Sequence, residues 1–198
     1  MLLTQGGGKS QGDYKNKYNL KPDKGIYNGR FLPKGTEVLN GYPNHGDILL
    51  QQPDTRFWKL SGSGTGALLK DYVDDFNRLC EHFFNDRGKK FRSNGMRSFE
   101  TQLRLRKASV AKGNCASVTK SNCSTAKPGT SKHGWGQAVD RKIANGDFDR
   151  SWSSKDYKWM VNNAATYNWH HPSWAQIDGS EPEAWHWEPM NTVITVIK

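Results

Sequence analysis

Residues 131–140 of the chain read SKHGWGQAVD, and residues 181–188 read EPEAWHWE. In each stretch a histidine and a carboxylate stand a few residues apart, among glycines, prolines and tryptophans. Imidazole and carboxylate groups are the side chains that most often bind metal ions and move protons in enzymes. The four residues are His133, Asp140, Glu183 and His186.

The first stretch can form a metal site only if the chain reverses its direction within it. Two ligands of one zinc ion lie only a few ångströms apart. In a straight strand, however, His133 and Asp140 would be roughly 23 Å apart, and along a helix about 10 Å apart. Gly134 and Gly136 can adopt the backbone angles that a sharp reversal needs. The spacing therefore predicts a loop followed by a strand, with His133 at the entry and Asp140 on the returning strand.

The second stretch leaves two carboxylates open as partners of its histidine. Glu183 would face away from His186 on a regular strand, so we expect it in a turn that begins at Pro182. There it could stay off an ion that His186 binds and face a nearby water molecule. Glu188 would share the face of His186 and is the second candidate. The spacing alone does not decide between them.

Length and patterning predict an α+β fold, with a small antiparallel sheet and flanking helices. We expect an N-terminal arm and a small strand-rich lead-in over residues 1–60, with residues 1–30 as a loose arm and short strands over 31–60 forming a hairpin layer. The main domain would cover residues 61–198 and begin with the glycine-rich run SGSGTG, either a flexible joint or a loop before a helix. Four strands are expected in its second half, within GQAVDRK, NWHH, AWHWE and NTVITVIK.

Three helices are predicted in this domain. The first covers residues 67–86 and ends at Gly88. It carries one apolar stripe of Leu69, Tyr72, Val73, Phe76, Leu79, Cys80 and Phe83. The second begins near Ser98 and the third near Ser153 or Ser154. On the third helix we expect one buried face of Tyr157, Met160, Val161 and Ala164.

The three cysteines and the remaining histidines have simpler interpretations. Cys115 and Cys123 bracket a polar loop that a disulfide would close, and a reduced pair is the alternative. Cys80 lies in the helical stripe and is expected as a buried thiol. We expect His82 to pack on the first helix. The other three histidines, His45, His170 and His171, are expected at the surface or at strand ends.

Charge and hydropathy limit the partners that the protein can have. The formal net charge of +10 favours polyanions such as nucleic acid or an anionic cell wall. The basic residues are spread over the chain without a nucleic-acid-binding motif, so we expect no nucleic acid partner. No run of eighteen apolar residues is present, which argues against membrane insertion. The N-terminus does not have the sequence pattern of a secretory signal. We also expect the protein to be a monomer.

Three motifs together resemble a known enzyme family. Residues 131–140 have the pattern S-x-H-x-x-G-x-A-x-D, residues 183–186 have E-x-W-H, and Met96-Arg97-Ser98-Phe99 with Gln102 is similar to Y-R-S-x-x-x-Q. The set resembles the zinc D-alanyl-D-alanine carboxypeptidases of the VanY type, which are LAS-type peptidoglycan metallopeptidases with a hedgehog-like fold. This group is related to D-Ala-D-Ala dipeptidases and to the L-alanyl-D-glutamate peptidases of phage endolysins. The resemblance covers roughly residues 67–190.

The resemblance implies a role for each motif residue. His133, Asp140 and His186 would bind zinc and leave an open position for water, Glu183 would be the catalytic base, and Arg97 would bind the substrate carbonyl. Ser131 and Gln102 would lie on the substrate side or support the site. Two positions depart from the pattern, because Lys132 replaces an acidic residue of many relatives and Met96 replaces the usual aromatic.

The resemblance also implies the reaction, which is hydrolysis of peptidoglycan stem peptides. Removal of a terminal D-alanine is favoured over cleavage inside the stem, as an L-alanyl-D-glutamate endopeptidase would do. A basic, non-catalytic cell-wall-binding module is the alternative from another class. A phage-encoded lysin that acts on the bacterial cell wall, delivered by the lysis machinery or by the virion, would fit the missing signal.

Overall fold

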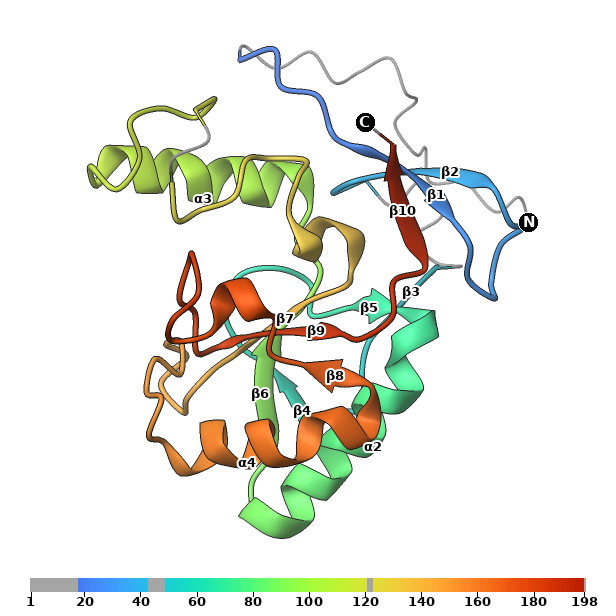
Figure 1. Ribbon diagram of the computed structural model, residues 1–198, viewed down its shortest axis with the longest axis vertical. Coiled ribbons are helices and arrows are strands. Elements are labelled where there is room, and N and C mark those ends of the chain that lie inside the picture. Colours follow the sequence, from blue (N-terminus) through green and yellow to red (C-terminus); the bar gives the residue numbers. More distant parts are fainter. Residues whose placement is uncertain (1–17, 43–48, 121–122, 198) are drawn as a thin grey trace, which may run out of the picture.

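The computed structural model describes residues 18–42, 49–120 and 123–197, and its strands form three sheets (Figure 1). The largest sheet has five strands in the order β4-β6-β7-β9-β8. These strands are β4 (Trp58–Leu60), β6 (Phe91–Asn94), β7 (Val139–Arg141), β9 (His186–Pro189) and β8 (Trp169–His170). A second sheet has the order β10-β1-β2, and in the third β3 (Leu50–Gln51) pairs with β5 (Leu68–Leu69).

The fold class is α+β, as the sequence predicts, but the main sheet is not purely antiparallel. Strands β4 and β6 run parallel, while the other three pairings are antiparallel. A parallel pair needs a crossover connection, which antiparallel neighbours do not. Here the crossover is β5 followed by helix α2 (Lys70–Arg87).

Helix α2 forms the core with the sheet that it crosses. All seven residues of the predicted apolar stripe are buried, including the thiol of Cys80. Phe76 and Phe83 meet Phe91 of β6 edge-on, with ring centroids 5.6 and 5.1 Å apart. The helix ends at Gly88 in the left-handed conformation, with φ of 64°, as predicted.

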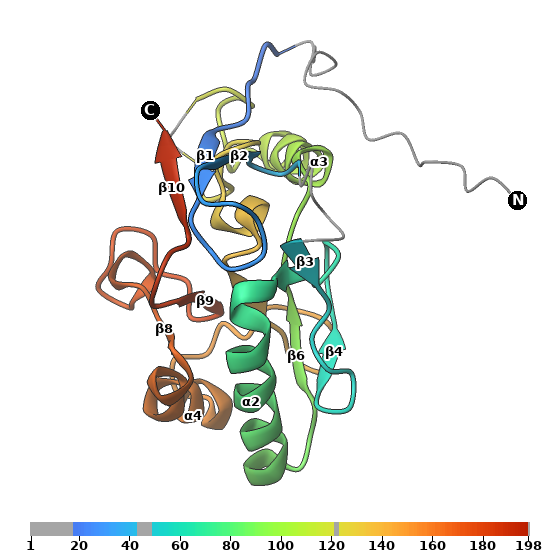
Figure 2. The same ribbon diagram turned by 90° about the vertical axis from the view of Figure 1, so that its right-hand side faces the viewer.

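The other two predicted helices begin at the residues expected to cap them. The Ser98 hydroxyl accepts a hydrogen bond from the Thr101 amide at the start of α3 (Phe99–Ala111), and Ser154 does the same at the start of α4 (Lys155–Asn163). Figures 1 and 2 show α2 and α4 together at one end of the molecule, with α3 and the three-stranded sheet at the other end.

The predicted buried face of α4 is wrong at one position. Val161 is 52% exposed, whereas Trp159 is buried in its place. The Trp159 ring packs edge-on against Phe83, and its indole N–H donates to Asp86 at 2.7 Å. Because neighbouring helix positions are about 100° apart, burial of Trp159 on one side of Met160 turns Val161 on the other side to solvent.

The N-terminal part of the chain is more integrated than the sequence predicts. The expected loose arm over residues 1–30 is wrong for β1 (Lys24–Tyr27), which is the central strand between β10 (Ile194–Ile197) and β2 (Thr36–Leu39); residues 1–17 lie outside the described residues. The expected hairpin layer over residues 31–60 is also wrong, because β2, β3 and β4 join three different sheets. The predicted domain boundary between residues 60 and 61 remains a prediction.

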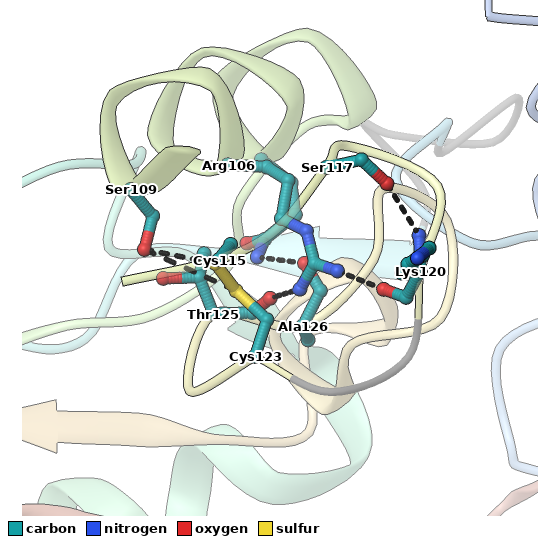
Figure 3. Close-up of a disulfide and its surroundings, with 9 residues drawn as sticks. Arg106, Ser109, Cys115, Ser117, Lys120, Cys123, Thr125 and Ala126 are labelled. Carbon is teal, nitrogen blue, oxygen red and sulfur yellow. Dashed lines mark hydrogen bonds between the residues drawn. A yellow bond between two sulfur atoms is a disulfide. The ribbon is translucent and has the colours of Figure 1, made fainter. Parts of the chain in front are cut away.

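The loop between α3 and the first motif is held by a disulfide and by one buried arginine (Figure 3). Cys115 and Cys123 are joined, with their α-carbons 4.9 Å apart, as expected for the polar loop. Arg106 of α3 is fully buried, and its guanidinium donates to the carbonyls of Lys120 and Thr125. This loop leads directly into the stretch that contains His133.

Breaking the disulfide should destabilise the protein by a moderate amount. A closed loop of this length restricts the unfolded chain by roughly 2–3 kcal/mol, so Cys115→Ala with Cys123→Ala should lower the free energy of unfolding by about that much. Denaturant unfolding of the double variant against the parent measures it. A Cys80→Ala variant, which has a cavity but an intact loop, is the control. Equal stability of double variant and parent, both without reductant, would contradict the prediction.

Candidate active site

Strand pairing places two of the four motif residues opposite one another. Strands β7 and β9 are antiparallel neighbours in the middle of the main sheet, and Asp140 is the register partner of His186. Directly opposed residues in a sheet have side chains within contact distance. Oδ1 of Asp140 accordingly lies 3.1 Å from Nδ1 of His186.

His133 reaches the same carboxylate from a short 3₁₀ helix, η1 (Lys132–Trp135). The Ser131 hydroxyl caps η1 by accepting from the His133 amide at 3.2 Å, and Gly136 ends it with φ of 67°. The chain thus reverses as predicted, but through a helical turn instead of a strand hairpin. Gly134 is needed for close packing, because a Cβ there would lie 2.0 Å from Oδ1 of Asn40.

The three predicted ligands lie close enough to share one ion. Nε2 of His133 is 3.0 Å from Oδ1 of Asp140, and the ligand atoms of His133, Asp140 and His186 are all within 4.8 Å of one another. Ligands of a tetrahedral zinc ion at about 2.1 Å would be about 3.4 Å apart. All three side chains are buried, and each comes from a different segment of the chain.

Hydrogen bonds outside the cluster orient both imidazoles toward its centre. Nδ1 of His133 lies 2.8 Å from the carbonyl of Gly95, which can only accept, so this nitrogen carries the hydrogen and Nε2 has a lone pair. Nε2 of His186 lies 3.0 Å from Oε1 of Glu188, which leaves Nδ1 toward Asp140. Partners of this kind are typical of histidines that bind metals.

The protonation of the cluster supports binding of a cation. Burial, together with the Arg97 charge, lowers the pKa of His133 to about 4, so its ring is neutral at pH 7. Its Nε2 lone pair and the Asp140 carboxylate are then two acceptors 3.0 Å apart. Burial alone would raise the pKa of Asp140, but His133 and Arg97 hold it well below its usual range. A cation between these atoms fits the donor set.

The two remaining ionisable groups of the cluster have opposite pKa shifts. Burial would lower the pKa of His186, but its bonds to Asp140 and Glu188 raise it to about 9. Burial raises the pKa of Glu183 to about 7. Oε2 of Glu183 lies 3.8 Å from Nδ1 of His186, at the edge of the cluster and partly exposed. Glu183 can therefore exchange a proton near neutral pH.

The position of Glu183 follows from a turn, as expected. The His186 amide donates to the Glu183 carbonyl at 3.0 Å, which closes a turn with Ala184 and Trp185 at its corner. Glu188 instead lies beyond His186, and its second oxygen is 3.7 Å from Nζ of Lys132. The two carboxylates that spacing left open thus lie on different sides of the histidine.

Arg97 lies beside the cluster and is only 13% exposed. Its Nη2 donates to Oδ2 of Asp140 at 3.1 Å, the oxygen that faces away from His133 and His186. Its Nε is buried and has no hydrogen-bond partner among residues 18–42, 49–120 and 123–197. The guanidinium therefore has donor capacity left for a ligand.

The two supporting residues of the resemblance contact the protein in different ways. Ser131 caps η1, as described above, and its carbonyl accepts from the Asn40 side chain at 2.8 Å. Gln102 is buried in α3, and its amide nitrogen donates to the carbonyl of Ala126 at 2.9 Å, three residues after Cys123. A substrate role for either residue remains a prediction.

Two side chains that support the site have no motif signal in the sequence. His171 directly follows β8, in agreement with the expected surface or strand-end position, and its Nε2 lies 3.0 Å from the Glu183 carbonyl while its ring stacks on Trp187. Trp174 packs on His186, with ring centroids 4.9 Å apart. Of the other histidines, His82 packs on Trp159 as expected, and His45 lies outside the described residues.

Comparison with solved structures shows the same fold in three other proteins. The LdcB LD-carboxypeptidase is 21% identical, with a TM-score of 0.54 over 84% of this chain and 75% of that one. VanYB in complex with D-Ala-D-Ala is 21% identical, with a TM-score of 0.52 over 78% and 85%. The D,D-dipeptidase VanXYg, bound to a D-Ala-D-Ala phosphinate analogue, is 20% identical, with a TM-score of 0.54 over 72% and 55%.

Comparison of sequences assigns the family. A search of curated protein sequences finds no match. The family model for VanY, D-alanyl-D-alanine carboxypeptidase, matches residues 66–191, which is more than half of the chain. The matched range contains the cluster of His133, Asp140 and His186. The chain belongs to the VanY D-alanyl-D-alanine carboxypeptidase family.

Proposed function

We propose that this protein is a zinc-dependent D-alanyl-D-alanine carboxypeptidase that removes the terminal D-alanine from peptidoglycan stem peptides. The observation that supports it most is the buried cluster of His133, Asp140 and His186, with Glu183 beside it. VanYB, which has the same fold, has been solved with D-Ala-D-Ala. The E-x-W-H motif favours a carboxypeptidase over an endopeptidase.

The three ligands would hold zinc through two neutral imidazoles and one carboxylate. When bound, the ion would lower the pKa of a water molecule and polarise the substrate carbonyl. Glu183 would take the proton of the attacking water on its carboxylate and deliver it to the nitrogen of the leaving D-alanine. Without the ion the pKa of Glu183 is about 7, raised by burial, and a carboxylate at the edge of the cluster is placed to receive and return a proton.

Arg97 would stabilise the charge that develops on the carbonyl oxygen. It is held against Asp140 at 3.1 Å, and its buried Nε has no partner in the described part of the chain. A positioned donor of this kind is typically worth about 10²–10³ in rate. His171 would act as a positioning residue, because it contacts the backbone of Glu183 and not the cluster itself.

Product analysis tests the proposed function against its alternatives. The zinc-loaded protein is incubated with a stem pentapeptide and, separately, with whole cell walls. Release of free D-alanine from the pentapeptide is the expected result. New amino termini in the walls without D-alanine would indicate an endopeptidase instead. Neither product from a zinc-loaded protein would favour the non-catalytic wall-binding module.

Zinc binding should release about one proton per chain at pH 7. Without metal, His186 has a pKa of about 9 and is protonated at pH 7, but it must be neutral to bind an ion. The apparent affinity should therefore rise with pH up to about 9, by at most tenfold per unit. Calorimetric titration in buffers of different ionisation enthalpy measures the protons released. A value near zero, with zinc bound, would contradict the predicted state of His186.

Retention on the anionic wall should depend on salt. The formal charge of +10 supports attraction to wall polymers. Sedimentation with purified walls should show binding that weakens strongly between low and high salt, while hydrolysis of a small peptide changes little. Sedimentation that does not depend on salt would contradict binding through charge.

None of the helices in the described ranges has the length and apolar character needed to cross a bilayer. A phage source, the delivery route and the monomeric state stay predictions.

A further inference from the structure

Lys142 is a buried cation next to the candidate site that the mechanism above does not use. It is 5% exposed and lies two positions after Asp140, where the chain leaves β7. Alternate residues of an extended strand share a face, so Lys142 lies on the side of Asp140. Arg141 lies on the other side and pairs with Asp149 and Asp156.

The ammonium of Lys142 lacks the carboxylate that a buried cation normally has. Within residues 18–42, 49–120 and 123–197, no ion pair includes Lys142, whereas Arg97 pairs with Asp140 and Lys132 with Glu188. The ammonium instead lies over an aromatic ring, with Nζ 3.0 Å from the ring centre of Phe148. A ring face compensates only part of the loss of hydration.

A second cation and a second aromatic ring continue the contact between Lys142 and Phe148 toward Glu183. The guanidinium of Arg150 lies 5.4 Å from the ring centre of Phe148 and 4.7 Å from that of Trp185. Trp185 is at the corner of the turn that carries Glu183, and its ring packs on Phe148 at 4.9 Å. We call Lys142, Phe148, Arg150 and Trp185 the Lys142 cluster.

The glycine-rich run SGSGTG, which the sequence left as a joint or a loop, packs against both buried cations. A Cβ at Gly62 would lie 2.9 Å from Cε of Lys142, and one at Gly64 would lie 3.1 Å from Cγ of Arg97. Both glycines have positive φ, of 90° and 111°. Positive φ favours glycine at both positions, and at Gly64 a Cβ would also lie 2.6 Å from the Met96 carbonyl oxygen.

We propose that Lys142, assisted by Arg150, binds a carboxylate of the stem peptide and thereby selects the substrate. A carboxylate would supply the ion pair that the protein itself does not provide in its described part. Strand positions two apart are separated by about 7 Å, and an extended peptide advances about 3.3–3.6 Å per residue. With the scissile carbonyl at Arg97, a carboxylate one or two residues along the bound peptide would reach Lys142. The inference rests on the proposed function for its substrate.

Stem peptides offer two such carboxylates, the C-terminal one and the α-carboxylate of the D-glutamyl residue. Binding is measured by calorimetry with zinc-loaded protein that carries Glu183→Gln to prevent turnover. One pair of probes is an acetylated peptide ending in D-alanyl-D-alanine, as the acid and as the amide. The other pair is a stem tripeptide amide with the D-glutamyl carboxylate free or amidated. The readout is the ratio of Kd between the amide and the acid.

For one pair of probes the acid should bind at least tenfold more tightly than the amide, and Lys142→Met should reduce this ratio to near one. Methionine keeps the apolar stem over Phe148, and Lys142→Arg should restore most of the ratio. The matched control is Lys59→Met, which removes an exposed charge on β4 of the same sheet.

The pair that responds identifies the carboxylate, and a response to the C-terminal acid means that Lys142 selects chain ends. Unchanged ratios for both pairs in a folded Lys142→Met protein would overturn the inference. Failure of the Glu183-containing protein to hydrolyse any stem peptide would overturn the proposed function instead. The ratio of Kd would still report on Lys142, so the two failures are distinguishable.

Discussion

Replacing Glu183 with glutamine should leave zinc bound and reduce release of D-alanine from a stem pentapeptide by about 10²–10⁴-fold. Glutamine keeps the size and the hydrogen-bonding oxygen of the side chain but cannot carry the proton from water to the leaving amine. The Glu183 carboxylate lies at the edge of the cluster, 3.8 Å from Nδ1 of His186, so its loss removes no ligand of the proposed set. Metal analysis and turnover on the same preparation measure both parts of the prediction.

Glu188→Gln is the matched control for this experiment. Glu188 contacts the opposite nitrogen of His186, and a glutamine oxygen can still accept that hydrogen bond. Loss of such a supporting partner typically costs about 10–100-fold in metal affinity or activity, and we expect the lower end for this mild change. A larger loss of turnover in Glu188→Gln than in Glu183→Gln, with zinc retained in both, would reverse the proposed roles.

Replacing His133 with alanine should abolish stoichiometric zinc binding and reduce turnover to the level of the metal-free protein. The ring supplies one of three ligands, and two remaining ligands cannot close a catalytic site. We expect the affinity to fall by more than the 10–100-fold that is typical of residues that only orient a ligand. Competition with a chromogenic chelator measures the affinity of variant and parent.

His82→Ala provides the control for the loss of a histidine as such. His82 packs on Trp159 and Tyr167, away from the cluster, and its Nε2 lies 3.2 Å from Asp86. Its replacement should leave zinc content and turnover unchanged apart from a modest loss of stability. Full zinc occupancy and parental turnover in His133→Ala would exclude the proposed ligand set.

Several local features could be predicted because the residues that determine them are neighbours in the sequence. The apolar stripe of α2 follows from helical periodicity, and its end follows from the tolerance of Gly88 for positive φ. The caps at Ser98 and Ser154 follow from the hydroxyl groups that precede each helix. The candidate ligands could be named because three short motifs contain them and resemble those of a known family.

The motifs could not predict how the site is supported. Spacing did not distinguish Glu183 from Glu188, and only the folded structure shows that Glu183 lies near Nδ1 of His186 and Glu188 near Nε2. The contact of His171 with the Glu183 carbonyl spans twelve residues and has no local pattern. These contacts depend on which strands are neighbours, which no periodicity encodes.

The sequence by itself thus determined the helices, their caps, the residue types of the site and the family that they resemble, and it left the pairing of Cys115 with Cys123 to the structure. Only the tertiary structure decided that β4 and β6 are parallel, that β1 pairs with β10 from the other end of the chain, and that Lys142 and Arg97 both lie against the glycine-rich run. The physical reason is range. Helix caps and amphipathic stripes depend on interactions between residues that are close in the sequence. Strand order and the surroundings of buried charges depend on contacts between segments that are distant along the chain.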